Sequence, residues 1–146
     1  PSVVQDADRM WTLRGEAGAV LDAETGPRVR EDIAVPVDRI DEALAAITEL
    51  AARSGHALYT YAHLGQGNLH PNVAVDPSSG AGRAVRAEIL AVARRLGGTV
   101  SGEHGVGSVK RSYVEDELGR PAVEILRGWK SLCDPDGVLN PGKLLP

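Results

Sequence analysis

The order of hydrophobic patterns between residues 29 and 102 leaves few folds open to this chain. Two segments with apolar residues at helical spacing alternate with short segments typical of β-strands. The β-α-β-β-α-β order predicts a ferredoxin-like sandwich, an α+β fold in which two helices cover one face of an antiparallel sheet. The predicted strands are 29–36, 56–63, 69–76 and 99–102, and the predicted helices between them are 38–54 and 83–96.

Glycines mark the ends of these predicted elements. Gly55 ends the first helix, and Gly97 and Gly98 stop the second. Gly65 and Gly67 permit a tight turn between the two middle strands, because glycine tolerates positive φ. We also expect one helix before the sandwich and two helices after it, followed by a tail rich in turn residues; these segments are 2–17, 106–118, 121–133 and 134–146.

The composition is typical of one globular domain covering residues 1–146. Apolar residues make up 42% and charged residues 25% of the chain, and Phe is absent, so the core must consist of Val, Leu, Ile and Ala. A net charge of −4 without a Lys/Arg cluster argues against a nucleic-acid partner. No apolar run has the length of a membrane span, and no signal peptide opens the chain.

The single cysteine, Cys133, excludes an internal disulfide and suits a reducing compartment, so we expect a cytoplasmic protein. Cys133 falls on the apolar face of the last predicted helix, where we expect it to be buried. Lys110 and Arg111 are expected on a solvated helix face.

Two short stretches contain candidate metal ligands. In AHLGQGNLHPN (62–72), His63 and His70 lie on either side of a glycine-rich turn, and SGEHGVG (101–107) adds Glu103 and His104. Two imidazoles and one carboxylate are a common ligand set for a catalytic divalent metal with an open position. Spacing alone leaves open that the histidines are ordinary loop or core residues, because no compact motif such as HExxH is present.

Two arginines are candidates for binding an anion. Arg14 continues an apolar helical stripe that we expect to pack on the domain and to carry the guanidinium inward. Arg30 lies in the first predicted strand, and the pair could hold a carboxylate with bidentate hydrogen bonds. The alternatives are an Arg14 that reaches solvent or pairs locally and an exposed strand charge at Arg30. The stripe is formed by Val3, Val4, Ala7, Met10 and Trp11.

Four blocks of the sequence resemble, in order, the C-terminal part of FAD-linked oxidases. These flavoenzymes include the glycolate oxidase FAD subunit, D-lactate dehydrogenase and D-2-hydroxyglutarate dehydrogenase. The resemblance covers nearly the whole chain and implies an enzyme that oxidises a D-2-hydroxy acid by hydride transfer to FAD. The blocks are EDIAVPVDRI, AHLGQGNLHPNVAVD, GGTVSGEHGVGSVKRSYVEDELG and DPDGVLNPGKLLP.

The resemblance also implies a role for particular residues. His63, His70 and Glu103 match ligands of a divalent metal, usually zinc, and His104 matches the active-site histidine beside it, the expected general base. Asn72 matches an amide that contacts the substrate, and Arg14 and Arg30 match positions that hold the substrate carboxylate. Asn140 and Lys143 match a tail that returns towards FAD.

Two departures from the family qualify this expectation. The family's Gly-Asp-Gly turn has Gln66 at its centre here, a neutral and weaker partner if that Asp orients a ligating histidine. Nothing in the chain resembles the family's N-terminal FAD-binding domain. We therefore expect the C-terminal portion of an oxidase, inactive by itself, whose partner is an FAD-binding domain or subunit, with a homodimer as one assembly to consider.

Two other classes of function stay open at this point. One is a ferredoxin-like module that binds a metal or small acid without turnover, and the other is a metal-dependent hydrolase that uses the same His/His/Glu set. The NPGK sequence of the tail favours the oxidase, because neither rival has an evident use for it.

Overall fold

β4 (Asn68–Val73) is the central strand of an antiparallel sheet in the computed structural model, which describes residues 6–146. On one side it pairs with β3 (Leu58–His63) from Leu58↔Val73 to His63↔Asn68. On the other side it pairs with β1 (Val29–Arg30) and then with β2 (Ile33–Ala34). A short 3₁₀ turn, η2 (Leu64–Gln66), joins β3 to β4, so these two strands form a hairpin.

The predicted α+β, ferredoxin-like arrangement is confirmed, with two local differences in the strands. The first predicted strand is divided into β1 and β2, with Glu31 and Asp32 between them. The predicted strand 99–102 is reduced to a single bridge between Thr99 and Ala34. Beyond this bridge the N–H of Ser101, the next one that could pair with β2, donates to the hydroxyl of Thr99 instead, and the N–H of Val100 donates to the carboxylate of Glu117 at 2.9 Å.

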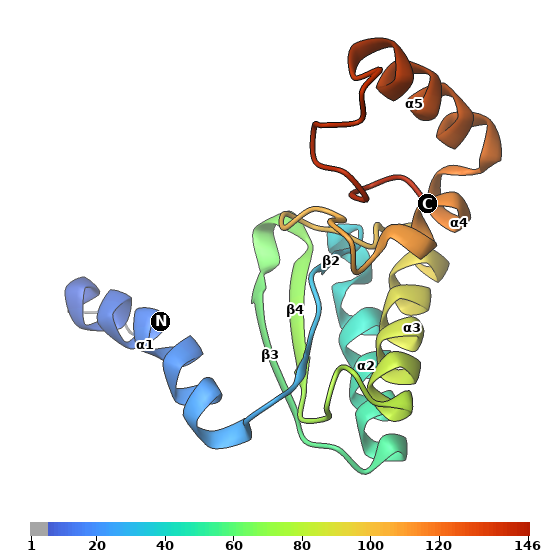
Figure 1. The fold of residues 1–146 in the computed structure, drawn as a ribbon. Helices are drawn as coiled ribbons and strands as arrows, with labels where there is room; N and C mark the ends of the chain where they lie inside the picture. Colours follow the sequence, from blue (N-terminus) through green and yellow to red (C-terminus); the bar gives the residue numbers. More distant parts are fainter. Residues whose placement is uncertain (1–5) are drawn as a thin grey trace.

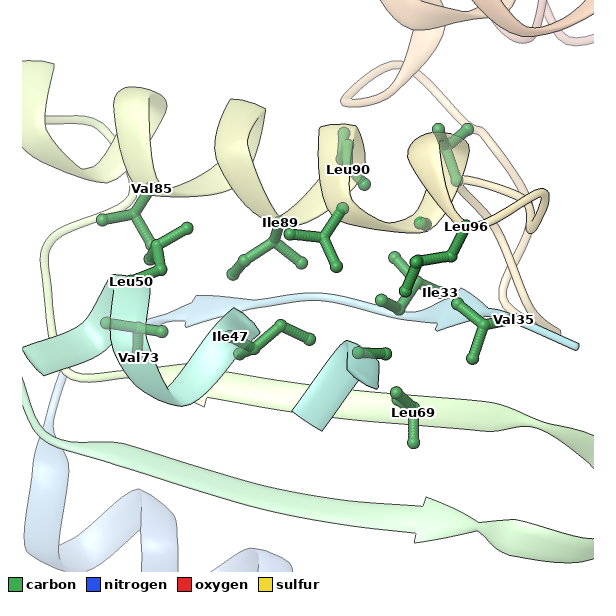
Figure 2. Packing of buried hydrophobic residues seen from close by; sticks show 14 of the residues in the cluster. Ile33, Val35, Ile47, Leu50, Leu69, Val73, Val85, Ile89, Leu90 and Leu96 are labelled. Atoms are coloured by element: carbon green, nitrogen blue, oxygen red, sulfur yellow. The ribbon is translucent and has the colours of Figure 1, made fainter. Parts of the chain in front are cut away.

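Two helices, α2 (Ile40–Ser54) and α3 (Gly80–Arg95), cover one face of the sheet (Figure 1). A 3₁₀ turn, η1 (Val37–Arg39), leads into α2. Figure 2 shows side chains from both helices and the strands meeting between these layers. The core is aliphatic, as predicted, and its fully buried members include Val29, Ile33, Ala43, Ile47, Leu69, Val73, Ile89, Leu90 and Ala93.

The opposite face of the sheet carries the polar side chains of β4. Leu69 and Val73 point into the core, so strand alternation turns Asn68, His70 and Asn72 to the face that the helices leave open. This choice of face places the candidate site on the open side of the sheet.

The N-terminal helix, α1 (Ala7–Thr25), differs from the prediction in length and packing. It begins after Asp6, whose side chain accepts a hydrogen bond from the N–H of Arg9, and it continues past the predicted end at residue 17 to Gly26. No residue of Ala7–Thr25 is fully buried, and Figure 1 shows the helix diverging from the sheet. The expected packing of its apolar stripe is therefore wrong for Met10 and Trp11, which are exposed, while Ser2, Val3 and Val4 lie outside the described residues.

The C-terminal part contains η3 (Arg111–Tyr113), α4 (Val114–Leu118) and α5 (Arg120–Cys133). The predicted helix 106–118 is wrong over its first half, because Gly105 and Gly107 have positive φ and the helical turns begin only at Arg111. The predicted burial of Cys133 is also wrong, since α5 buries only Val123 and Cys133 is exposed. No helix among residues 6–146 is long and apolar enough to cross a membrane.

Candidate metal and active site

The three predicted metal ligands lie together at the end of the β3–β4 hairpin. Glu103 Oε1 lies 3.3 Å from His63 Nε2 and 3.2 Å from His70 Nε2. The ligand atoms of the three residues all lie within 4.8 Å of one another. His70 and His63, which precede Glu103 by 33 and 40 positions in the chain, thus lie close to the same carboxylate oxygen. This closeness is what a site for one ion requires.

Close backbone packing fixes the two loops that carry these ligands. Gly67 has a φ of +72°, and a Cβ there would lie 2.0 Å from the carbonyl oxygen of Val35. A Cβ on Gly102 would lie 2.1 Å from Asn68 Oδ1 and 2.7 Å from an oxygen of Asp32. Glycine is required at both positions, and the hairpin turn and the Glu103 loop are thereby held against the sheet.

Asp32, which sequence reasoning missed, lies beneath the site. Its buried carboxylate accepts the backbone N–H of His104 at 2.8 Å and that of Glu103 at 3.0 Å. Its other oxygen lies 3.7 Å from His70 Nδ1. The one signal in the sequence was an acidic pair, Glu31 and Asp32, in the middle of a predicted strand that carries Val29, Ile33 and Val35.

Electrostatics favour an ionised Asp32 and a neutral His70. Burial raises the pKa of Asp32, but the N–H donors of His104 and Glu103 and the nearby positive charges bring it below its ordinary value of 3.8. Burial lowers the pKa of His70 below 6.5, and the carboxylates of Asp32 and Glu103 oppose this effect without reversing it. At neutral pH His70 is therefore an uncharged imidazole, the form that binds metals.

His104 lies on the solvent side of the same cluster. Its ring stacks on that of His70 with a centroid distance of 5.2 Å, and its side chain is 62% exposed. Nε2 lies 3.8 Å from Glu103 Oε1. His104 is thus beside the candidate ligands and open to a molecule that approaches from solvent.

Lys110 is buried, and its predicted place on a solvated helix face is wrong. Its ammonium donates to the carbonyls of Asp32 and Val100, both at 2.6 Å, and lies 3.3 Å from Glu31 Oε2. Glu31 also accepts from Arg86 Nε at 2.6 Å. Because residues 106–110 are not helical, Lys110 can enter the interior and join the segments that carry Asp32 and Val100.

The cavity beside the candidate ligands has a volume of about 430 Å³ and includes Arg14. Arg14 is exposed, and its guanidinium carbon lies 5.5 Å from the centroid of the Trp11 ring. The expected inward orientation on a packed helix is therefore wrong, although the residue does face the site. The lining consists of Arg14, Gly15, Ala17 and Gly18 from α1, with Tyr61, Ala62, His63, His70, Glu103 and His104.

The other two predicted substrate contacts do not line this cavity. Arg30 is exposed and forms an ion pair with Asp22 of α1. Asn72 is buried, accepts from Arg28 Nε at 3.0 Å and donates to the carbonyl of His70 at 2.9 Å. Both side chains are therefore engaged with protein groups, and their substrate roles stay predictions.

Comparison with known proteins places the whole chain in one family. Residues 3–144 match the family described as FAD linked oxidases, C-terminal domain. The chain belongs to this family. The resemblance inferred from the four sequence blocks is thus confirmed.

Relatives of this FAD-linked oxidase C-terminal domain are considerably longer. Over 96% of its length it is 37% identical to glycolate oxidase subunit GlcD of Bacillus subtilis, and over 97% it is 38% identical to D-lactate dehydrogenase of Archaeoglobus fulgidus. Over 94% it is 34% identical to the mitochondrial D-2-hydroxyglutarate dehydrogenase of Rattus norvegicus. The chain spans 31%, 31% and 26% of these three proteins, respectively.

Arg28 attaches α1 of the oxidase domain to the open face of the sheet and was also missed in the sequence. Its side chain is 3% exposed and donates to Asn72, to the carbonyl of Leu21 and to Thr25 Oγ1 at 3.0–3.1 Å. It also forms an ion pair with Asp22 at 2.6 Å. One guanidinium therefore connects the last turn of α1 to β4.

The tail of the oxidase domain returns to the loop that follows His104. The N–H of Leu144 donates to the carbonyl of Gly107 at 2.9 Å, and Arg111 donates to the carbonyl of Gly142. Asn140 and Lys143 are exposed on this tail, where their flavin contacts stay predictions.

Gln66, the departure from the family turn, is exposed in η2. Asp32 places a carboxylate oxygen 3.7 Å from Nδ1 of His70, the ring nitrogen that faces away from Glu103. The neutral residue at position 66 therefore does not leave His70 without an acidic neighbour.

Proposed function

We propose that this domain supplies the substrate- and metal-binding half of a flavin-dependent active site. The complete enzyme would oxidise a D-2-hydroxy acid of the glycolate, D-lactate or D-2-hydroxyglutarate type by hydride transfer to FAD. The supporting observation is the convergence of His63 and His70 on Glu103, with an exposed His104 beside them. The names of the relatives support the same class of substrate.

A divalent ion, zinc by its donor set, fits the His63, His70 and Glu103 group. The two Nε2 atoms and the carboxylate oxygen are close enough to share one ion, and His70 is held neutral by burial. When bound, such an ion supplies a Lewis acid that makes the substrate hydroxyl more acidic.

The side chains of the domain would perform the remaining tasks. Arg14 binds the substrate carboxylate at the α1 side of the cavity. His104 accepts the hydroxyl proton at Nε2, the ring nitrogen on the Glu103 side. Arg30 and Asn72 are further proposed carboxylate contacts. Arg30 could exchange Asp22 for the substrate, and Asn72 could turn its Nδ2 donor from the carbonyl of His70 to the substrate.

FAD would accept the hydride from the substrate Cα. Asn140 and Lys143 would reach it from the tail, which is tied to the loop after His104 through Leu144 and Gly107. An FAD-binding domain or subunit is the partner that this proposal needs. A homodimer and a cytoplasmic location stay predictions.

The metal site is tested by elemental analysis of the purified chain. We expect zinc in the wild type and its loss in His70→Ala. The chain has four histidines, and His56 lies outside the cluster, so His56→Ala is a matched control that should retain the metal. Equal metal content in His70→Ala and His56→Ala would reject the assignment.

The reaction is tested in the enzyme that contains this domain together with its flavin-binding part. We expect His104→Gln to lower kcat on a D-2-hydroxy acid by about 10²- to 10⁴-fold, the usual contribution of a general base, with an unchanged metal content. Binding of metal and hydroxy acid with no flavin reduction in the wild type would instead favour a non-catalytic binding module.

A further inference from the structure

We propose that Asp32 is a positioning residue that orients His70 and anchors the loop of Glu103 and His104, without itself binding the metal. The inference deepens the proposed metal site and rests on it. It explains why a carboxylate is buried between β1 and β2. This carboxylate binds the backbone N–H groups of Glu103 and His104, which are 71 and 72 residues away in the chain.

Asp32 contacts the Glu103–His104 loop and lies close to His70, but it does not reach His63. One oxygen, Oδ2, accepts the N–H of His104 at 2.8 Å, the N–H of Glu103 at 3.0 Å and the hydroxyl of Ser101 at 3.3 Å. Oδ1 lies 3.2 Å from the N–H of Glu103 and 3.7 Å from His70 Nδ1. The backbone at Glu103 and His104 is thus fixed by a group that is 2% exposed.

Among residues 6–146, two overlapping sets of side chains could hold an ion, and both include His70. One set is His63, His70 and Glu103, and the other is Asp32, His70 and His104. The carboxylate of Asp32 already accepts hydrogen bonds from two backbone N–H groups and one hydroxyl. Glu103 Oε1 instead lies 3.2, 3.3 and 3.8 Å from the Nε2 atoms of three histidines.

The two ring nitrogens of His70 face different carboxylates, one at the proposed metal site and one beneath it. Nε2 faces Glu103 and Nδ1 faces Asp32. Nδ1 is buried and lacks a hydrogen-bond partner among the described residues, so the carboxylate is the group that favours a proton there. A proton on Nδ1 leaves the lone pair on Nε2, where a metal would bind, and an acidic neighbour of this kind is common behind ligating histidines.

Asp32→Asn is the direct test, because it keeps the shape of the side chain and removes its charge. We expect affinity for zinc, titrated against a chromophoric chelator, to fall about 10- to 100-fold. The backbone amides of Glu103 and His104 should exchange hydrogen faster than in the wild type, both measured without metal.

Asp134→Asn is a matched control. Asp134 is also a buried carboxylate that accepts two backbone N–H groups, those of Val138 and Leu139, at 2.9 and 3.0 Å. We expect this variant to lose stability and keep the wild-type zinc affinity. Unchanged affinity in Asp32→Asn, or an equal loss in both variants, would overturn the proposal.

Two further measurements keep the test decisive. If Asp32→Asn does not fold, Asp32→Ser, which retains an acceptor oxygen, should show the same loss of zinc affinity. In the wild-type chain without metal, the amides of Glu103 and His104 should be protected, whereas that of Gly105 should not. If the Glu103 and His104 amides are protected but the chain binds no zinc, the metal site is rejected and the role of Asp32 in anchoring the loop is retained. Equal exchange at all three amides would reject that anchoring role.

Discussion

Charged side chains buried between residues 28 and 32 determine how the site is built. Arg28, Glu31 and Asp32 are all less than 7% exposed, and each bonds to a residue more than 40 positions away. The alternating pattern predicted that Val29 and Ile33 face the core, and both are completely buried. It could not predict the burial of Arg28 and Asp32, because a strand pattern gives the two faces and not what later covers the second one. Nor could it predict that Glu31, on the face of Val29 and Ile33, finds Arg86 and Lys110 as partners.

Lys110 offers a prediction about these buried charges. Lys110→Met should lower the free energy of unfolding by about 3–5 kcal/mol, since it leaves the buried Glu31 with one cation fewer and two carbonyls without a donor. Chemical denaturation measures the effect. Arg111→Met, at the exposed neighbouring position, is the control and should have a much smaller effect. A similar loss in both variants would contradict a specific role for Lys110.

At the scale of elements, the parts that pack on each other were predictable, whereas the packing predicted for the two projecting helices was wrong. The helices α2 and α3 and the β3–β4 hairpin follow their apolar patterns and glycines closely. The pattern of α1 predicted packing, yet among residues 6–146 nothing buries Met10 or Trp11. An apolar stripe indicates that a helix can pack on another element. Whether it does so depends on a complementary apolar surface opposite the stripe.

The attachment of α1 leads to a prediction about Arg28. Arg28→Ala should destabilise the chain by about 1–3 kcal/mol, because Asn72 loses a buried donor. Hydrogen exchange in the last turn of α1 should become faster. Arg30→Ala removes the exposed partner of the same Asp22 and should leave that exchange nearly unchanged. Unaltered exchange in Arg28→Ala would show that other contacts hold the helix.

The junction of α5 and the tail predicts a dependence on pH. The hydrogen bond from Lys130 lowers the pKa of Asp134 below 3.8, and the N–H groups of Leu139 and Val138 act in the same direction. The ionised carboxylate therefore stabilises the turn above pH 3.8, and this contribution is lost as the pH falls through the lower folded-state pKa.

NMR titration of the Val138 and Leu139 amides measures this effect. Their shifts should change with an apparent pKa below 3.8 in the wild type, and the transition should be absent in Asp134→Asn. A transition at or above 3.8 would contradict the stabilising direction.

At the scale of the whole molecule, two helices leave apolar side chains in solvent. Met10 and Trp11 on α1 and Trp129 and Leu132 on α5 are all at least half exposed. Exposed apolar area of this kind binds other apolar groups. We expect the chain by itself to enhance the fluorescence of a hydrophobic dye while it is still folded.

The double change Trp129→Gln and Leu132→Gln should reduce this dye binding and shift the melting temperature little, since both side chains are exposed. Glu124→Gln, also exposed on α5, is the control and should leave the dye signal unchanged. A native wild-type chain that does not enhance the dye would contradict the expectation.

The length of the turn between β3 and β4 determines which face of the sheet carries His63. His63 pairs with Asn68, which places it on the same face as His70, and Gly67 holds the turn against Val35. One inserted or deleted residue in this turn would move the imidazole of His63 to the opposite side of the sheet. Surface loops usually tolerate changes in length, but here the count of residues between the two histidines is as much a part of the site as the histidines themselves.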